Sequence, residues 1–225
     1  MKSKLGKLLR SAVMNGKIHE VDILLEKGAD INYNMPDGTS PYGGTPLNVA
    51  ASFGNMKMVK HLIERGANVE TKDLLGFRPY ITAKYSDSKN SKEIAAYLKS
   101  IESEELHNLK NKLEQLEKYA LSDDLLAFLQ SDKLLIELSE NEFDLYEIIF
   151  YSLIDTVETE FLGKKLLLIS KDVDGGSFEL VWDKEAKCLG YIDIEHGACN
   201  IVCSFEEFMN NPTLYAVKIA NGEYE

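Results

Sequence analysis

The sequence predicts a two-domain protein, with an all-α stack of helix-turn-helix repeats over residues 1–103 and an α+β domain over residues 104–225. Three observations predict this division. The segment 19–32 recurs as a near-copy at 57–70, which is typical of stacked helical repeats. Short alternating apolar segments, which are typical of strands, begin only after residue 160. The net charge also changes sign between the two parts, and the length suits two domains.

The second copy of the repeat contains the signals of two short helices. Thr45 can accept a hydrogen bond from an N–H group at a helix start, and Pro46 suits the first helical position. Gly54 permits the tight turn between the helices, and Gly66 permits a left-handed cap after the second one. An apolar stripe predicts the buried side of that second helix. The stripe consists of Met58, Val59, Leu62 and Ile63.

Four short motifs resemble the ankyrin repeat family. That family carries TPLHxA in its first helix, an inner glycine, and GAD or GAN after its second helix. The corresponding motifs here are TPLNVA (45–50), Gly54, GAD (28–30) and GAN (66–68). The resemblance implies a helical stack with a concave face that binds another protein, and it implies no particular partner. Asn48 stands where the family has His, so we expect different hydrogen bonds between the repeats at this position.

Only the middle repeat is complete. The first copy begins near Lys4 and lacks the Thr-Pro start. The third copy, FRPYITA at 77–83, retains the proline and the alanine but has no inner glycine and no GAD. We therefore expect three repeats over about residues 4–100, of which the outer two are atypical.

The loop 34–46 is about five residues longer than the ankyrin pattern. We expect Asp37, Thr39 and Tyr42 at its tip to contact a protein partner, because Tyr is favoured where binding energy concentrates. The alternative is a tolerated surface insertion, since a longer loop costs little free energy.

The charge is unevenly distributed. Residues 1–100 contain 15 Lys and Arg against 10 Asp and Glu, a net charge of +5, and residues 101–225 contain the remaining 10 against 27, a net charge of −17. An acidic domain disfavours nucleic acid and anionic membranes as partners and favours a basic protein. Solubility alone is the alternative explanation. The three cysteines all lie in the second half and do not suggest a disulfide framework, which favours a reducing, cytoplasmic setting. No apolar stretch is long enough to predict a transmembrane span.

The middle of the chain predicts helices. Residues 91–120 contain no Gly or Pro and carry leucines at helical spacing, so we expect a helical connector that holds the two domains in a fixed relation. Ser122 is the expected cap of a further helix. The apolar segment 142–154 fits a helix or a strand.

Strands are expected at 164–170, 177–183, 189–197 and 199–203. In the second of these, Phe178, Leu180 and Trp182 share one face. Ser204 and Glu207 then form a capping box for a helix that ends before Pro212. Helices followed by short sequential strands and a closing helix predict an α+β domain with an antiparallel sheet.

Several of these segments, in this order, resemble the SUKH superfamily, also called Smi/Knr-like. The matching residues are 113–129, the turn Asp174-Gly175-Gly176, Asp183, the pair Gly190 and His196, and the helix Ser204–Phe208. The superfamily includes many bacterial immunity proteins. The resemblance therefore implies an α+β fold that binds and blocks a cognate toxin and has no catalytic role.

Two clusters could carry chemistry. Asp193, Glu195 and His196 contain the groups of an acid–base site, but in a strand His196 would point away from the two carboxylates. Of the three cysteines, only Cys199 and Cys203 approach the spacing of zinc ligands. Because no phosphate-binding or nucleophile motif is present either, we expect no catalytic residue, no metal and no cofactor.

The sequence thus favours a protein-binding protein without enzymatic activity. The preferred interpretation is an immunity protein that occludes the basic active surface of a bacterial toxin, such as a nuclease. The alternative is an intracellular ankyrin adaptor that regulates partner proteins. In the second domain we expect binding through acidic residues at turns and strand ends, where we expect exposure. These residues are Asp174, Asp183, Asp193 and Glu195.

Overall fold

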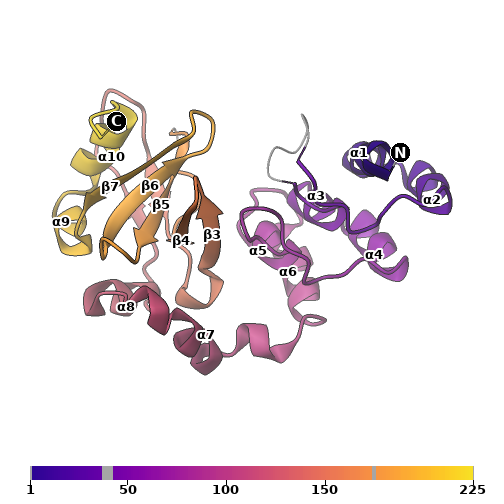
Figure 1. Ribbon diagram of the computed structural model, residues 1–225, viewed down its shortest axis with the longest axis horizontal. Coiled ribbons are helices and arrows are strands. Elements are labelled where there is room, and N and C mark those ends of the chain that lie inside the picture. The colour runs from indigo at the N-terminus through magenta and orange to yellow at the C-terminus, as the bar shows by residue number, and fades with distance from the viewer. Residues whose placement is uncertain (1, 37–42, 174–175, 225) are drawn as a thin grey trace. The chain divides into compact units, whose positions relative to one another are not determined.

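A computed structural model describes residues 2–36, 43–173 and 176–224 (Figure 1). The chain divides into two compact units, Met1–Ser103 and Glu104–Glu225. No helix that the structure describes is long and apolar enough to cross a membrane.

The described part of the first unit contains three pairs of antiparallel helices, stacked side by side (Figure 1). Each pair joins a helix that begins a repeat to a second helix that ends it. The pairs are α1 (Lys2–Met14) with α2 (Ile18–Glu26), α3 (Pro46–Ser52) with α4 (Met56–Glu64), and α5 (Pro79–Lys84) with α6 (Ser91–Lys99).

The second pair forms as its local signals predict. The Thr45 hydroxyl accepts a hydrogen bond from the N–H group of Asn48, whose side chain in turn accepts from the Thr45 N–H group, and Pro46 is the first helical residue. Gly54 and Gly66 adopt φ angles of +65° and +94°, which the following turns require. Met58, Val59 and Leu62 are buried, whereas Ile63 is only half-buried.

The expectation of one helical segment over 91–120 is wrong. Helix α6 ends at Lys99, and a turn over residues 100–103 precedes the 3-10 helix η1 (Glu104–His107) and helix α7 (Leu109–Leu116). Asn108 starts α7 anew, because its side chain accepts hydrogen bonds from two N–H groups of the first turn. Ser and Asn side chains compete with the helix for backbone groups, so they can break a segment that lacks Gly and Pro.

The second unit is built on a five-stranded antiparallel sheet in which neighbours in the sequence are neighbours in space, in the order β3-β4-β5-β6-β7 (Figure 1). This confirms the expected antiparallel sheet. The strands are β3 (Val157–Phe161), β4 (Lys164–Leu168), β5 (Phe178–Asp183), β6 (Cys188–Asp193) and β7 (Ala198–Cys203).

Four helices pack with one face of this sheet. They are α7, α8 (Asp123–Leu129), α9 (Phe205–Asn210) and α10 (Pro212–Ala220). Phe178, Leu180 and Trp182 lie together in this core, as the alternating pattern predicts. The buried Trp182 indole donates to the Tyr119 carbonyl at 3.0 Å, and the Tyr119 hydroxyl donates to the Leu166 carbonyl at 3.2 Å. These bonds satisfy polar groups that would otherwise be costly to bury.

The remaining elements resolve the open alternatives and correct some expectations. Within 142–154 the structure has a strand, β2 (Glu147–Ile149), which forms a separate hairpin with β1 (Leu135–Glu137). The 3-10 helices η2 (Glu117–Tyr119) and η3 (Leu153–Asp155) join larger elements. The capping box of Ser204 and Glu207 is confirmed. The sequence analysis missed β1, β3 and α10.

Candidate protein-binding surfaces

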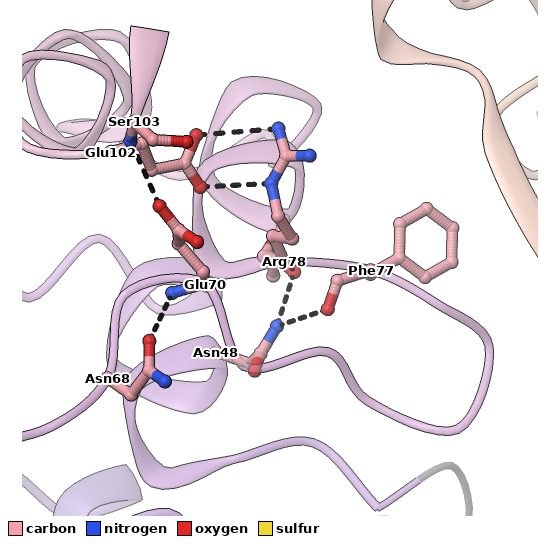
Figure 2. Close-up of polar contacts among 8 residues, drawn as sticks. Asn48, Asn68, Glu70, Phe77, Arg78, Glu102 and Ser103 are labelled. Atoms are coloured by element: carbon pink, nitrogen blue, oxygen red, sulfur yellow. Dashed lines mark hydrogen bonds and ion pairs between the residues drawn. The ribbon is translucent and has the colours of Figure 1, made fainter. Parts of the chain in front are cut away.

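Successive ankyrin-like repeats are joined by a recurring hydrogen bond. Arg10 and Asn48 occupy the same position in the first and second copies. The Arg10 guanidinium donates to the Gly44 carbonyl at 3.0 Å, and the Asn48 amide donates to the Phe77 carbonyl at 3.1 Å (Figure 2). Both accepting residues lie two positions before the proline that starts the next repeat. Asn48 therefore connects the second repeat to the third, through a set of hydrogen-bond partners of its own.

This series ends at the third repeat. Ile81 stands where the two earlier copies have Arg10 and Asn48, and it is buried. An isoleucine side chain cannot donate a hydrogen bond to a following repeat. The third helix pair therefore receives this bond from the second pair but cannot make it to a following one.

A second set of bonds joins the segments that follow the outer helices. The Asn32 side chain accepts from the Asn68 N–H group at 2.8 Å. The Glu70 carboxylate accepts from the Ser103 N–H group at 2.9 Å, as Figure 2 shows. Asn32 and Glu70 are 38 residues apart and are corresponding residues of the two copies. The bonds extend the repetition to the end of the unit.

An ion pair lies beside the last of these bonds. The Arg78 guanidinium contacts the Glu102 carboxylate through two nitrogens, at 3.0 and 3.4 Å (Figure 2). The Glu102 side chain is 0% exposed. Removing one partner of such a pair leaves an uncompensated charge in the interior, which is strongly destabilising. Arg78 and Glu102 therefore fix the turn that ends the third repeat.

Several large apolar side chains of the first unit are exposed, among them Phe53 at 58%, and two of them lie on neighbouring loops. Met35 is 57% exposed and Leu74 is 51% exposed. The two loops are joined by a hydrogen bond from the Asn34 amide to the Lys72 carbonyl at 3.4 Å. We call Met35 and Leu74 the loop pair. Sequence reasoning missed both residues, although each is an apolar residue in a segment between repeats.

The predicted contact residues of the long loop, Asp37, Thr39 and Tyr42, lie outside the described residues, and so does Asp174 of the second unit. Met35 belongs to the long loop itself, and Leu74 lies on the neighbouring loop that is hydrogen-bonded to it. The long loop remains a proposed contact region.

In the second unit, Asp193 and His196 lie together at the end of β6. One Asp193 oxygen accepts from the His196 N–H group at 2.9 Å, and the other lies 2.7 Å from His196 Nδ1. The expectation that His196 points away from Asp193 is wrong, because the strand ends at Asp193 and residues 194–197 form a turn. Glu195 is exposed on that turn, as expected.

Asp193 and His196 line a pocket of about 410 Å³. Its walls also include the aromatic rings of Phe143, Phe178 and Tyr191 and the aliphatic Ile219. Among the described lining residues, Asp193 supplies the carboxylate and His196 the imidazole. The pocket therefore combines apolar walls with one carboxylate, an arrangement that can receive an amphipathic or cationic group.

Of the predicted acidic contacts that the structure describes, only Glu195 is exposed: Asp193 is half-buried, with 17% of its side chain exposed, and Asp183 is buried. Asp183 is only 6% exposed, so the expectation of an exposed side chain is wrong. Its carboxylate accepts hydrogen bonds from the N–H groups of Glu185 at 2.8 Å and Ala186 at 3.1 Å. An Asp side chain that bonds the backbone two residues on stabilises a turn. Asp183 thus has a structural role between β5 and β6.

Glu179 on β5 is an acidic residue that sequence reasoning missed. Burial raises its pKa to about 8, and the nearby carboxylates of Asp172 and Asp193 raise it as well. A hydrogen bond from the backbone acts in the opposite direction. Burial is the largest cause of this raised pKa, and the two neighbouring carboxylates add negative charge near this end of β5 and β6.

The three cysteines are free, and none belongs to a described metal cluster. No group of three or more His, Cys, Asp or Glu side chains that could hold a metal ion lies among the described residues. Burial raises the pKa of the Cys203 thiol to about 11, with a further contribution from the Glu207 charge. A thiol with such a pKa stays protonated at neutral pH and is a poor nucleophile.

Comparison with known proteins assigns the first part of the chain. A family model described as ankyrin repeats (3 copies) matches residues 6–73. No curated protein matches the chain. The N-terminal region therefore carries ankyrin repeats, which indicate a protein–protein interaction module. The match ends before the third helix pair and the second unit.

Proposed function

We propose that the protein acts by binding another protein and has no catalytic activity. The observation that carries this proposal is the ankyrin match over residues 6–73. The loop pair supports it, because exposed apolar side chains on adjacent loops suit a protein contact.

More specifically, we propose that the second unit is a SUKH-like domain and that the protein is an immunity protein. The antiparallel sheet with four packed helices is compatible with this assignment. Residues 104–225 contain 10 basic and 26 acidic residues, a net charge of −16. An acidic domain of this kind suits a basic toxin such as a nuclease. The free cysteines fit the reducing environment of the cytoplasm.

The proposed mechanism is occlusion of the toxin's active surface. A nuclease surface that receives phosphates is positively charged, so an acidic partner is attracted to the same place. Asp193 and Glu195 supply negative charge at the mouth of the pocket and on the adjacent turn. Because such attraction is screened by salt, the complex weakens as the ionic strength rises.

Co-expression tests the proposal. The protein is produced together with the product of a toxin gene that lies beside its own gene, and bacterial growth is measured. We expect growth to be restored and a stable complex to form. Failure of both would contradict the immunity function. The variant Glu195→Lys should weaken the complex. Glu104→Lys is its matched control, because it makes the same change of charge at an exposed residue on η1.

The alternative is an ankyrin adaptor, and the loop pair is the observation that favours it. A pull-down with the full chain separates the two functions. One dominant basic partner that salt displaces supports immunity, whereas several unrelated partners lost on replacing Met35 and Leu74 by Ser support the adaptor. An enzymatic function would require that a double variant, Glu195→Gln with His196→Ala, loses function while it retains binding.

A further inference from the structure

The two edges of the five-stranded sheet differ in how well they are protected against pairing with a further strand. Strand β3 forms one edge and β7 forms the other. An edge strand presents unpaired N–H and C=O groups to which a further strand can bond, and proteins commonly block such pairing with charged side chains. Which edge is blocked therefore indicates where another chain can add.

Strand β3 is blocked. Its sequence, VETEF, places two carboxylates along the edge. Glu158 forms an ion pair with Lys118 and accepts a hydrogen bond from the Gln115 side chain at 2.5 Å. Just before the strand, the Lys112 ammonium donates to the Thr156 carbonyl at 2.6 Å. Side chains of α7 and η2 therefore hold charges at this edge.

Strand β7 is open. Its sequence, ACNIVC, contains no charged residue and no proline. None of its six residues is buried, and Ile201 is 37% exposed. Among the strands that the structure describes, β7 pairs with β6 alone. A strand of six residues offers an edge about 20 Å long, with a register shift against β6 between Ile201 and Cys203.

The strand is nevertheless fixed by contacts with the rest of the second unit. Ala198, Val202 and Cys203 pack against the core of the second unit. The Asn200 amide lies 3.3 Å from the Tyr191 hydroxyl, to which it donates. A fixed, uncharged edge strand is a ready template for β-addition, in which backbone hydrogen bonds supply affinity and alternate side chains supply specificity.

Charges at both ends of β7 decide which chain can add. Asp193 and Glu195 precede the strand, and the exposed Glu206 and Glu207 follow it. If two copies of this chain paired antiparallel through β7, the acidic start of one strand would lie beside the acidic end of the other. Like charges placed opposite each other in a sheet are destabilising. The same charges attract a segment with Lys or Arg at both of its ends.

We propose that β7 is a β-addition site for an extended, uncharged segment of about six residues, flanked on both sides by Lys or Arg, in a partner protein. The inference rests on the proposed function, in that it takes the partner to be basic, and it names how the second unit holds that partner. It does not depend on the partner being a toxin.

A labelled peptide tests this site with the full chain. The probe has six alternating Thr and Val residues with two Lys at each end, and binding is measured by fluorescence anisotropy. Two matched peptides serve as controls: one carries Glu in place of Lys, and the other has N-methyl groups on alternate core residues and so cannot complete a ladder. We expect the probe to bind at least about tenfold more tightly than either control.

Matched variants locate the binding site. Ile201→Lys places a charge in the middle of β7, whereas Leu162→Lys makes the same exchange at the β3–β4 turn, where Leu162 is 64% exposed. We expect Ile201→Lys to weaken binding of the probe about tenfold and Leu162→Lys to leave it unchanged. Hydrogen exchange should show new protection at residues 199–202 when the probe binds.

Three outcomes would overturn the inference. They are equal affinity for the three peptides, equal effects of the two lysine variants, and a dimer in sedimentation that Ile201→Lys dissociates. If Ile201→Lys does not fold, the N-methylated peptide and the exchange pattern decide alone. Growth rescue without binding of the probe at β7 would leave the proposed function standing and reject this site. Binding of the probe without growth rescue would leave this site standing and contradict the proposed immunity function.

Discussion

The two units of the protein are stabilised in different ways. In the ankyrin unit the same kind of bond recurs from copy to copy, as with Arg10 and Asn48, because equivalent residues meet equivalent neighbours. In the sheet unit the contacts that join distant elements follow no such period, as between Trp182 and the Tyr119 carbonyl. Periodic contacts can be recognised in a sequence, whereas single long-range contacts require the folded structure.

The units also differ in charge. Residues 1–103 contain 15 basic and 11 acidic residues, a net charge of +4, against −16 for residues 104–225. In the ankyrin unit the candidate contact is apolar, through Met35 and Leu74, and in the sheet unit it is acidic, around Asp193 and Glu195. The comparison teaches that one chain carries two surfaces suited to chemically different contacts.

The largest expected effect is on the buried ion pair of the ankyrin unit. Replacing Arg78 by Met leaves the Glu102 charge buried without this partner and should lower the free energy of unfolding by about 3–5 kcal/mol. Arg65→Met is the control, because Arg65 lies 3.6 Å from Asp22 in a partly exposed pair, and there we expect less than about 1 kcal/mol. Urea denaturation followed by circular dichroism measures both. Equal losses would contradict a special role for the Arg78–Glu102 pair.

The next effect is a pH dependence of the sheet unit. The pKa of Glu179 is raised from 4.5 to about 8, so the folded state holds this proton more tightly than the unfolded state. Its contribution to stability is full below pH 4.5 and is lost as the pH rises through about 8. Between pH 5 and pH 9 the wild type should lose about 2 kcal/mol of its free energy of unfolding, a magnitude reduced because solvent screens part of the effect. We expect Glu179→Gln to remove this loss.

Thermal unfolding of the wild type and of Glu179→Gln across this pH range gives the measurement. Glu160→Gln on β3 is the control, because Glu160 is exposed. Parallel pH profiles for the wild type and Glu179→Gln would show that the Glu179 proton does not contribute.

A smaller effect is expected at the bond between the second and third repeats. Asn48→Ala removes the bonds to the Phe77 carbonyl and to the Thr82 hydroxyl at 3.0 Å, and should cost about 1.5 kcal/mol. Asn48→His restores the residue of the ankyrin pattern and should cost less. The midpoint of urea unfolding decides, and an equal loss in both variants would mean that the residue acts through packing alone.

The smallest expected effect concerns the partner. Glu195→Lys should weaken a complex with a basic partner about tenfold, or about 1.4 kcal/mol, without changing thermal stability. Glu104→Lys should have little effect on the complex, and isothermal calorimetry compares the two. A loss of thermal stability in Glu195→Lys would point to a structural role of this side chain instead.

The sequence predicts elements best where the signal is local. Two helix starts are predicted from a few neighbouring residues, one by Thr45 with Pro46 and the other by Ser204 with Glu207. Both helices form there. The sequence does not predict strand β3, because two of its five residues are glutamates and it lacks a continuous apolar pattern. Helix α10 is missed because a proline can end one helix and also suit the first position of the next, and Pro212 does both here.

The candidate sites were less predictable for a physical reason. Whether Asp193 meets His196 depends on where β6 ends, and a difference of one residue reverses the direction of a side chain. The burial of Asp183 and the raised pKa of Glu179 depend on neighbours that the fold supplies. The Arg78–Glu102 pair joins residues 24 positions apart, which no local pattern shows.

The most direct test of the central claim is calorimetry of the full chain with a toxin encoded beside its gene, once such a gene is identified, at ionic strengths from about 0.05 to 0.5 M. The proposed function predicts a stable complex whose affinity falls steadily with salt. It further predicts that the toxin's catalytic activity is lost in the complex. No binding, or an affinity that does not change with salt, would contradict an acidic protein that blocks a basic surface.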